Sequence, residues 1–174
     1  MIKIYFSEIN NGESSHELLH RAVQDYYGKC DLDLSYKMGE KPYFIEPNAP
    51  KFSISHSEKL WICAISENEV GCDIQIHKPY PRYKAVAKRY FHSAEICKMN
   101  AAESPIYVFF DTWVKKEAVA KLTGRGLDSS LSGVPTADMP LFVKNVTLPI
   151  DVPYSAALAS YESFDVNEIS IIKM

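Results

Sequence analysis

The order of predicted secondary-structure elements is the feature that most restricts how this 174-residue chain can fold. Residues 2–6 are β-branched and aromatic, which predicts a strand. A helix follows, because Ser14 and Glu17 have the spacing of a capping box and Gly28 is a typical C-cap. Short apolar pieces separated by turn residues then predict a small antiparallel sheet, at residues 43–45, 52–55 and 60–66.

The same order begins again near residue 69 with a strand predicted at 69–77. An amphipathic stretch and a short helix after Ser93 lead to a long helix from Pro105 to Gly124, since proline favours the first helical position and glycine the position after the last. The remaining strand-like segments are 141–148, 154–161 and 168–174.

Strands and helices in this order favour an α+β fold with antiparallel sheets. No stretch of linker-like composition divides the chain. We therefore predict a single compact domain over residues 1–174, built from two pseudo-symmetric halves at about 1–67 and 68–174. Each half is expected to be a small antiparallel sheet packed with a long helix.

The composition is ordinary for a soluble globular domain, with 47% hydrophobic and 24% charged residues. No apolar run reaches the roughly 20 residues of a membrane span, and the N-terminal residues lack the pattern of a signal peptide. We therefore expect a cytoplasmic protein with no membrane partner. The net charge of −3 argues against nucleic-acid binding. The cysteines form no CxxC pair and are expected to be buried free thiols: Cys30, Cys63, Cys72 and Cys97.

Positive charge is nevertheless concentrated in one part of the chain, between Arg82 and Arg125. This part offers a place for an anionic ligand or an acidic partner. Its other basic residues are Lys84, Lys88, Arg89, Lys98, Lys115, Lys116 and Lys121.

The long helix carries a charged pair on its apolar side. At about 100° per residue, Phe109, Phe110 and Trp113 gather on one side of the helix. Glu117 falls inside that apolar arc, and Lys121 follows one turn later. A charged pair that points the same way as aromatic residues must be paired, bind a metal ion or line a cleft. The alternative is a helix rotated so that the pair lies at the edge of the core.

A carboxylate in a predicted strand is the second candidate feature. Asp73 lies in GCDIQIH, although aspartate is disfavoured in strands. Asp73 and Gln75 are two residues apart and share a face, so with Glu117 they can offer three oxygen ligands to Mg²⁺. The alternative is a solvent-facing strand surface with polar residues at alternate positions.

The segment FSISHS at 52–57 is the third candidate feature. Ser55, His56 and Ser57 lie at the end of a predicted strand and can donate hydrogen bonds to a phosphate. His56 has the alternative of a structural role. Nothing nearby forms a nucleophile elbow or a zinc-ligand spacing, which leaves hydrolase and zinc interpretations weak.

Five segments occur in a specific order: GEKPYF at 39–44, FSISHS at 52–57, GCDIQ at 71–75, RYFHSAE at 89–95 and WVKKEAVAKLTGRGL at 113–127. In sequence and spacing they resemble the 4′-phosphopantetheinyl transferase superfamily, in its longer type with two pseudo-symmetric halves in one chain. The last segment is the most distinctive, because W-x-x-K-E-A-x-x-K-x-x-G-x-G-L is matched at every fixed position. The resemblance covers roughly half of the chain.

The resemblance implies transfer of the phosphopantetheine arm of coenzyme A to a serine of an apo acyl or peptidyl carrier protein, with release of 3′,5′-ADP. Asp73 and Glu117 would hold Mg²⁺, or Mn²⁺ in its place, against the coenzyme A pyrophosphate. Glu117 would also help to deprotonate the serine, and Lys121 would stabilise the attacked phosphate or protonate the leaving group. The residues expected at the nucleotide phosphates are Lys41, Ser55 and His56.

The sequence departs from the family pattern at two places. Gln75 stands where the family usually has a second acid, so the protein charge at the metal falls from three negatives to two. The family's basic stretch around the first helix is replaced by NNGESSHELLHR, in which His16 and Arg21 are the only obvious substitutes.

Two alternatives to an enzyme stay open. One is a non-catalytic relative that binds coenzyme A or a carrier protein, and the other is a small α+β domain with a structural Glu–Lys pair. We expect a monomer, because two halves in one chain can form the cleft that smaller relatives build between subunits.

Overall fold

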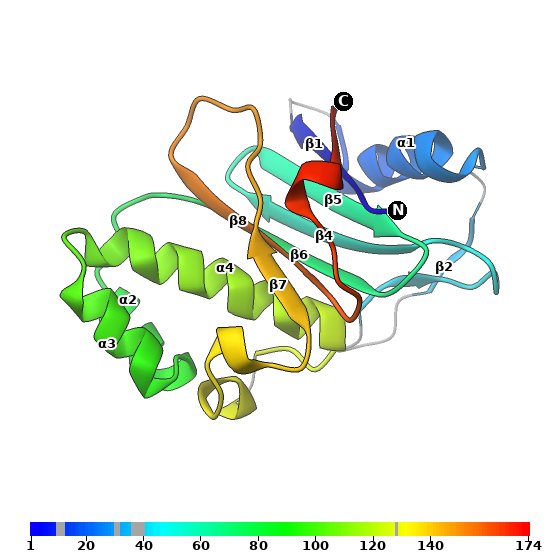
Figure 1. Ribbon diagram of the computed structural model, residues 1–174. Coiled ribbons are helices and arrows are strands. Elements are labelled where there is room, and N and C mark those ends of the chain that lie inside the picture. The colour runs from blue at the N-terminus through cyan, green and yellow to red at the C-terminus, as the bar shows by residue number, and fades with distance from the viewer. Residues whose placement is uncertain (10–12, 30–31, 36–40, 128) are drawn as a thin grey trace.

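The computed structural model describes residues 1–9, 13–29, 32–35, 41–127 and 129–174 (Figure 1). The helices are α1 (Ser15–Tyr27), α2 (Tyr83–Tyr90), α3 (Ser93–Ala101) and α4 (Pro105–Thr123), with short 3-10 helices η1 (Ser129–Ser132), η2 (Thr136–Asp138) and η3 (Val166–Glu168). The strands are β1 (Lys3–Glu8), β2 (Leu34–Ser35), β3 (Tyr43–Phe44), β4 (Lys51–Ser57), β5 (Leu60–Ser66), β6 (Val70–Ile76), β7 (Phe142–Asn145), β8 (Tyr154–Ser160) and β9 (Ser170–Lys173). The fold is α+β, as predicted.

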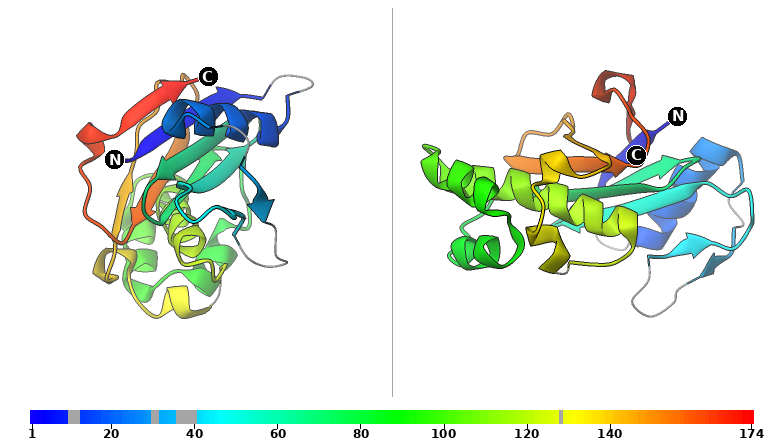
Figure 2. Two further views of the ribbon diagram at one scale, coloured as in Figure 1. Left: turned by 90° about the vertical axis from the view of Figure 1, so that its right-hand side faces the viewer. Right: turned by 60° about the horizontal axis from the view of Figure 1, so that its bottom comes forward.

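Two sheets pack face to face, and a helix covers the outer face of each (Figures 1 and 2). The first sheet has the order β4-β5-β1-β9 and the second β6-β8-β7. Alternation along β1 explains the layers, because Ile4 and Phe6 face the second sheet while Tyr5 packs with α1. On the second sheet, Ala157 and Ala159 of β8 pack with α4 instead.

Two expectations about strand pairing are wrong. The predicted sheet of three neighbouring pieces is incomplete, because β3 pairs with β2 while β4 pairs with β5. The C-terminal strand β9 does not stay with its own half but lies parallel to β1, so the first sheet is mixed and not antiparallel. Pairing between strands so distant in sequence depends on which edge is free in the folded chain, which local patterns do not reveal.

The boundaries of α1 confirm the predicted capping signals. The Ser14 hydroxyl accepts a hydrogen bond from the Glu17 amide (3.2 Å), and the Glu17 carboxylate accepts one from the Ser14 amide (2.7 Å). Gly28 ends the helix in the left-handed conformation, with φ of 77°.

The helix α4 is more deeply buried than a single apolar arc predicts. Phe109 and Phe110 pack with α2 and α3, whereas Val114 and Leu122 pack on β8 and its surroundings. The prediction for the cysteines is partly wrong, since Cys63 and Cys72 are buried free thiols but Cys97 is exposed; Cys30 lies outside the described residues. None of the helices in the described ranges is long and apolar enough to cross a membrane.

Candidate active site

Close contact between α4 and β6 positions the candidate residues. A Cβ atom added at Gly71 would lie 2.0 Å from the Ala118 carbonyl oxygen and 2.6 Å from the Leu122 amide nitrogen, so only glycine fits there without a backbone shift. This contact lays the C-terminal half of α4, with Glu117 and Lys121, over the face of β6 that carries Asp73. The structure therefore brings Asp73, Glu117 and Lys121 together.

Asp73 is the buried centre of this arrangement. Its neighbours Cys72 and Ile74 point into the core between the sheets, so Asp73 points to the opposite face, toward α4. One carboxylate oxygen, Oδ1, accepts hydrogen bonds from Lys121 Nζ (2.8 Å) and from Ser55 Oγ (2.6 Å). The other, Oδ2, is buried and has no hydrogen-bond partner within the described part of the chain. Such an orphaned anionic oxygen calls for a ligand.

Glu117 lies one turn before Lys121 and is half-buried. Burial, followed by the negative charge of Asp73, raises the pKa of Glu117 to about 7, although Lys121 opposes the shift. A carboxyl group with this pKa exchanges its proton near neutral pH, which is what a general base requires. A cation placed between the two carboxylates would favour the ionised form of Glu117.

Gln75 is the next residue on the α4-facing side of β6, half-buried and opposite Ser155 of β8. It thus continues the polar surface that Asp73 begins. Among the described residues, no group of three or more histidine, cysteine, aspartate and glutamate side chains is placed to hold a metal ion. A cation here would have two carboxylates and the Gln75 amide as its protein donors.

A ladder of serines joins the edges of the two sheets beside Asp73. Alternate backbone N–H groups of β6 donate to alternate serine hydroxyls of β4: Cys72 to Ser53 (3.0 Å), Ile74 to Ser55 (3.4 Å) and Ile76 to Ser57 (2.9 Å). Ser55 therefore accepts from Ile74 and donates to Asp73 at the same time. The sequence analysis missed Ser53 and this role of the ladder, although serines at alternate positions were a visible signal.

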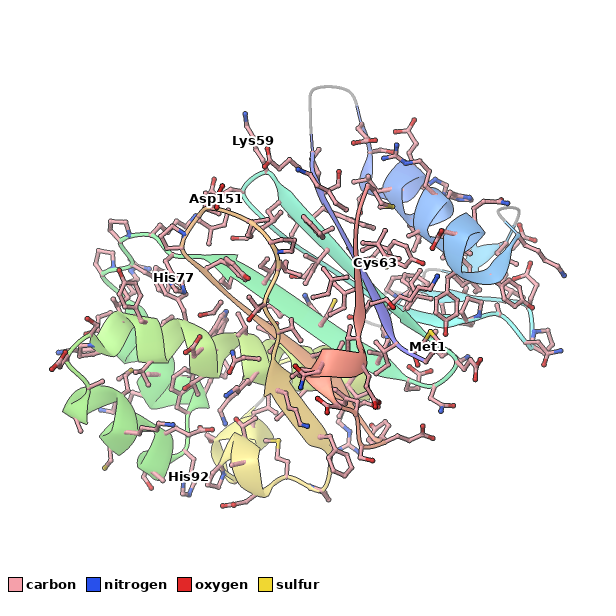
Figure 3. All side chains as sticks on the ribbon, turned by 45° about the horizontal axis from the view of Figure 1, so that its top comes forward. Met1, Lys59, Cys63, His77, His92 and Asp151 are labelled. Carbon is pink, nitrogen blue, oxygen red and sulfur yellow. The ribbon has the colours of Figure 1, made fainter. Side chains whose placement is uncertain are left out.

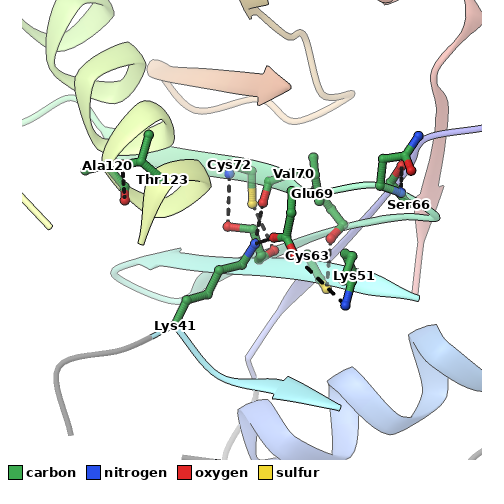
Figure 4. Close-up of polar contacts among 12 residues, drawn as sticks. Lys41, Lys51, Cys63, Ser66, Glu69, Val70, Cys72, Ala120 and Thr123 are labelled. Atoms are coloured by element: carbon green, nitrogen blue, oxygen red, sulfur yellow. Dashed lines mark hydrogen bonds and ion pairs between the residues drawn. The ribbon is translucent and has the colours of Figure 1, made fainter. Parts of the chain in front are cut away.

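Lys41 lies between the start of β6 and the end of α4 (Figure 4). Its ammonium group donates to the Val70 carbonyl oxygen (2.6 Å) and pairs with Glu69 (3.2 Å). Burial lowers the pKa of Lys41, and Glu69 opposes this shift. Residues 39 and 40 of the GEKPYF segment lie outside the described residues.

Two adjoining hollows open beside these residues. One of about 460 Å³ is lined by Lys41, Lys51 and Thr123, and one of about 270 Å³ by Lys41, Ile54, Glu117 and Lys121. His56 is exposed and follows Ile54 on the same face of β4.

Lys116 does not belong to the predicted basic surface, because its side chain is completely buried. Its ammonium group donates to the Leu131 carbonyl oxygen and forms an ion pair with Glu95 (2.9 Å). Glu95 in turn accepts from both the amide and the hydroxyl of Thr136. Lys116 thus ties α4 to α3 and to the η1–η2 segment and is a structural residue.

A second polar cluster lies at the other end of β6, which sequence reasoning also missed. His77 Nε2 is 2.8 Å from the Ser155 hydroxyl, which donates to Asp111. The His77 ring stacks on Phe110 near the N-terminal part of α4 (Figure 3). Burial lowers the pKa of His77, and Asp111 opposes the shift.

Comparison with known proteins identifies the family of this chain. Residues 69–156, just over half of the chain, match the family described as the 4′-phosphopantetheinyl transferase superfamily. The matched segment contains β6, α4 and therefore Asp73, Glu117 and Lys121. The chain belongs to this superfamily.

Individual relatives match part of their length. A Synechocystis sp. protein provisionally named a 4′-phosphopantetheinyl transferase is 33% identical over 108 residues, 59% of this chain and 44% of the relative. A 4′-phosphopantetheinyl transferase of Bacillus subtilis is 30% identical over 118 residues, which cover 66% of this chain and 52% of the relative. The transferase Sfp of Bacillus subtilis strain 168 is 27% identical over 148 residues, which cover 76% of this chain and 64% of the relative. This chain spans about half the length of the curated relatives it matches.

Proposed function

We propose that this protein transfers the 4′-phosphopantetheine group of coenzyme A to a serine hydroxyl of an apo acyl or peptidyl carrier protein. The observation that carries the proposal is the ion pair of the buried Asp73 with the partly exposed Lys121, with Glu117 one turn before Lys121, at the positions where the family motif has these residues. A structural ion pair alone would not need a third, partly protonated carboxyl group beside it.

The proposed reaction joins the serine oxygen to the phosphorus on the pantetheine side of the coenzyme A pyrophosphate. The bond from that phosphorus to the bridging oxygen breaks, and 3′,5′-ADP leaves. Glu117 takes the serine proton, because a hydroxyl group is a poor nucleophile until a base removes its proton. Lys121 stabilises the negative charge on the attacked phosphate or supplies a proton to the leaving group.

The proposal includes Mg²⁺, or Mn²⁺ in its place, held by Asp73, Glu117 and Gln75. The unpartnered Asp73 Oδ2 and the raised pKa of Glu117 both fit a cation at this position. All three donors are oxygens, which hard cations prefer. When bound, the ion would neutralise charge on the pyrophosphate.

We propose that the nucleotide of coenzyme A binds in the two hollows beside Lys41, with Ser55 and His56 of β4 contributing to its binding. Lys41 would have to exchange part of its contact with Glu69 for a phosphate oxygen. Ser55 would act mainly through Asp73, since its hydroxyl proton is already donated to that carboxylate.

We further propose a single domain of the longer, two-half type, acting as a cytoplasmic monomer. Each half begins with a strand followed by a helix, β1 with α1 and β6 with the helices up to α4, which supports the pseudo-symmetric description. The halves also meet along the serine ladder between β4 and β6.

The test is incubation with fluorescent coenzyme A, Mg²⁺ and a panel of apo carrier proteins, followed by gel fluorescence and mass measurement. We expect at least one carrier to gain the mass of the labelled phosphopantetheine group. Gln75 favours one alternative, a relative that binds coenzyme A or a carrier without transfer. Saturable coenzyme A binding with no labelling of any carrier would support that alternative.

A further inference from the structure

Helix α1 carries two histidines one turn apart on its outer surface. His16 and His20 belong to the sequence His-Glu-Leu-Leu-His, and their Nε2 atoms lie 3.1 Å apart. The two ring centroids are 4.2 Å apart. This helix covers the outer face of the first sheet, whereas α4 covers the second (Figures 1 and 2), so the histidine pair is separate from the site described above.

We propose that His16 and His20 form a binding site for a late first-row divalent metal ion such as Zn²⁺, Ni²⁺ or Cu²⁺. A metal–nitrogen bond is about 2.0–2.1 Å, so two nitrogens on one ion lie about 2.9 Å apart at a right angle and about 3.3 Å apart in a tetrahedron. The observed 3.1 Å, at which the two rings share a hydrogen bond without a metal ion, falls between these values. Imidazole suits these ions, and two histidines at i and i+4 on one helix face are a known arrangement for binding them.

The charged neighbours favour a cation over an anion. An open hollow of about 670 Å³ beside the pair is lined by His16, His20 and the side chains of Glu13, Glu17 and Arg21. Arg21 forms an ion pair with Glu13, which leaves Glu17 as the uncompensated charge when the imidazoles are neutral. The net charge of these lining residues is therefore negative, which repels a phosphate group and attracts a metal ion.

The local geometry also indicates binding without peptide hydrolysis. In a His-Glu-x-x-His metallopeptidase the glutamate acts as the general base. Here the Glu17 carboxylate accepts hydrogen bonds from the amide and the hydroxyl of Ser14 in the capping box. Within the described ranges no third side chain joins the pair to complete a set of three metal-binding residues.

The test is calorimetric titration of the untagged, metal-stripped protein with Zn²⁺ and, separately, Ni²⁺, in excess Mg²⁺ so that oxygen-donor sites are filled. The protein carries Cys97→Ser, because that exposed thiol is itself a metal ligand. We expect one site, and a higher unfolding temperature with the ion bound, since the ion joins two turns of a folded helix. His16→Ala and His20→Ala should each weaken binding by at least about tenfold, because even changes outside the ligand shell cost that much.

His56→Ala is the matched control, since His56 is an exposed histidine on β4. Its metal affinity should equal that of the unsubstituted protein. The proposal is overturned if no Zn²⁺ or Ni²⁺ binding is seen, or if binding is unchanged in both α1 variants while circular dichroism shows them folded. Carrier loading is not part of the readout, so this result is independent of the proposed transferase activity.

Discussion

The ionisation of Glu117 depends strongly on its surroundings. Burial and Asp73 raise the pKa of Glu117 to about 7 from its ordinary value of 4.5. Between these two values the folded protein binds more protons than the unfolded chain, so stability falls as pH rises from 4.5 toward 7. The penalty is complete above the folded-state pKa and absent below the unfolded-state pKa.

This difference predicts how Glu117→Gln behaves in metal-free buffer. Because the amide carries no charge, the variant should be more stable than the wild type at pH 8, by about 1–2 kcal/mol after allowance for solvent screening. The advantage should disappear near pH 4.5. Urea unfolding in EDTA across this range measures it, with Glu103→Gln at an exposed position as control. A pH-independent difference between Glu117→Gln and wild type would contradict the raised pKa of Glu117.

Gln75 sets the charge at the proposed metal site. Gln75→Glu adds a third carboxylate to Asp73 and Glu117, so the Mg²⁺ concentration for half-maximal carrier loading should fall. This prediction concerns the metal concentration for half-maximal loading and not the maximal rate. A metal titration of both proteins decides the matter, and an unchanged or higher half-maximal concentration means that Gln75 does not contact the ion.

At the residue scale, the sequence predicted which residues meet but not the partners that each one takes. Helical spacing places Glu117 and Lys121 one turn apart on α4, and strand alternation places Asp73 on one face of β6. The expectation that these two elements meet came from the resemblance to the family motif. The hydrogen bond from Ser55 to Asp73 and the burial of Lys116 against Glu95 arise from segments distant in the chain. No pattern within one element specifies such contacts.

Among the elements, the contact of α4 with β6 decides whether the site forms. Gly71→Ala would place a methyl group 2.0 Å from the Ala118 carbonyl oxygen, so the helix must shift away from the strand. We expect destabilisation of about 1–3 kcal/mol, as for an overpacked core, and loss of loading as Lys121 moves from Asp73. Urea unfolding and loading rates measure both effects.

A second glycine substitution separates a general loss of stability from the loss of contact between α4 and β6. Gly28→Ala changes a glycine with φ of 77° at the end of α1, where no atom of the described residues beyond its chain neighbours lies within 4 Å of the added Cβ. It should reduce stability through backbone strain alone and leave the loading rate per folded molecule unchanged. If Gly71→Ala behaves in the same way, close approach of α4 to β6 is not needed for activity.

The elements also show where sequence reasoning stops. Periodicity and capping signals predicted α1, α4 and the main strands, because these patterns report on local burial and local hydrogen bonds. They did not predict that β9 returns to lie parallel to β1, or that β3 pairs with the two-residue strand β2. Both pairings join strands from different segments of the chain and are determined only when the sheets assemble.

For the whole molecule, the exposed side of α2 is the surface we expect an acidic carrier protein to contact. Lys84 and Lys88 are exposed there, while Ala87 packs into the aromatic core below. Charge reversal at both lysines should raise the KM for the carrier severalfold and leave that for coenzyme A unchanged, because charges at the rim of an interface govern association. Lys59→Glu, an exposed lysine on the turn between β4 and β5, is the control. Equal effects on both substrates would place α2 at the nucleotide.

The central claim is that the molecule transfers phosphopantetheine with Glu117 as base. The most direct test measures carrier loading and thermal unfolding on the same preparations of wild type, Glu117→Gln and the control Glu103→Gln, with Mg²⁺ present. We predict that Glu117→Gln stays folded and loses at least about 10²-fold in kcat, as expected for loss of a positioned general base, while Glu103→Gln loads like wild type. Wild-type loading by folded Glu117→Gln would contradict the role of Glu117 as the general base.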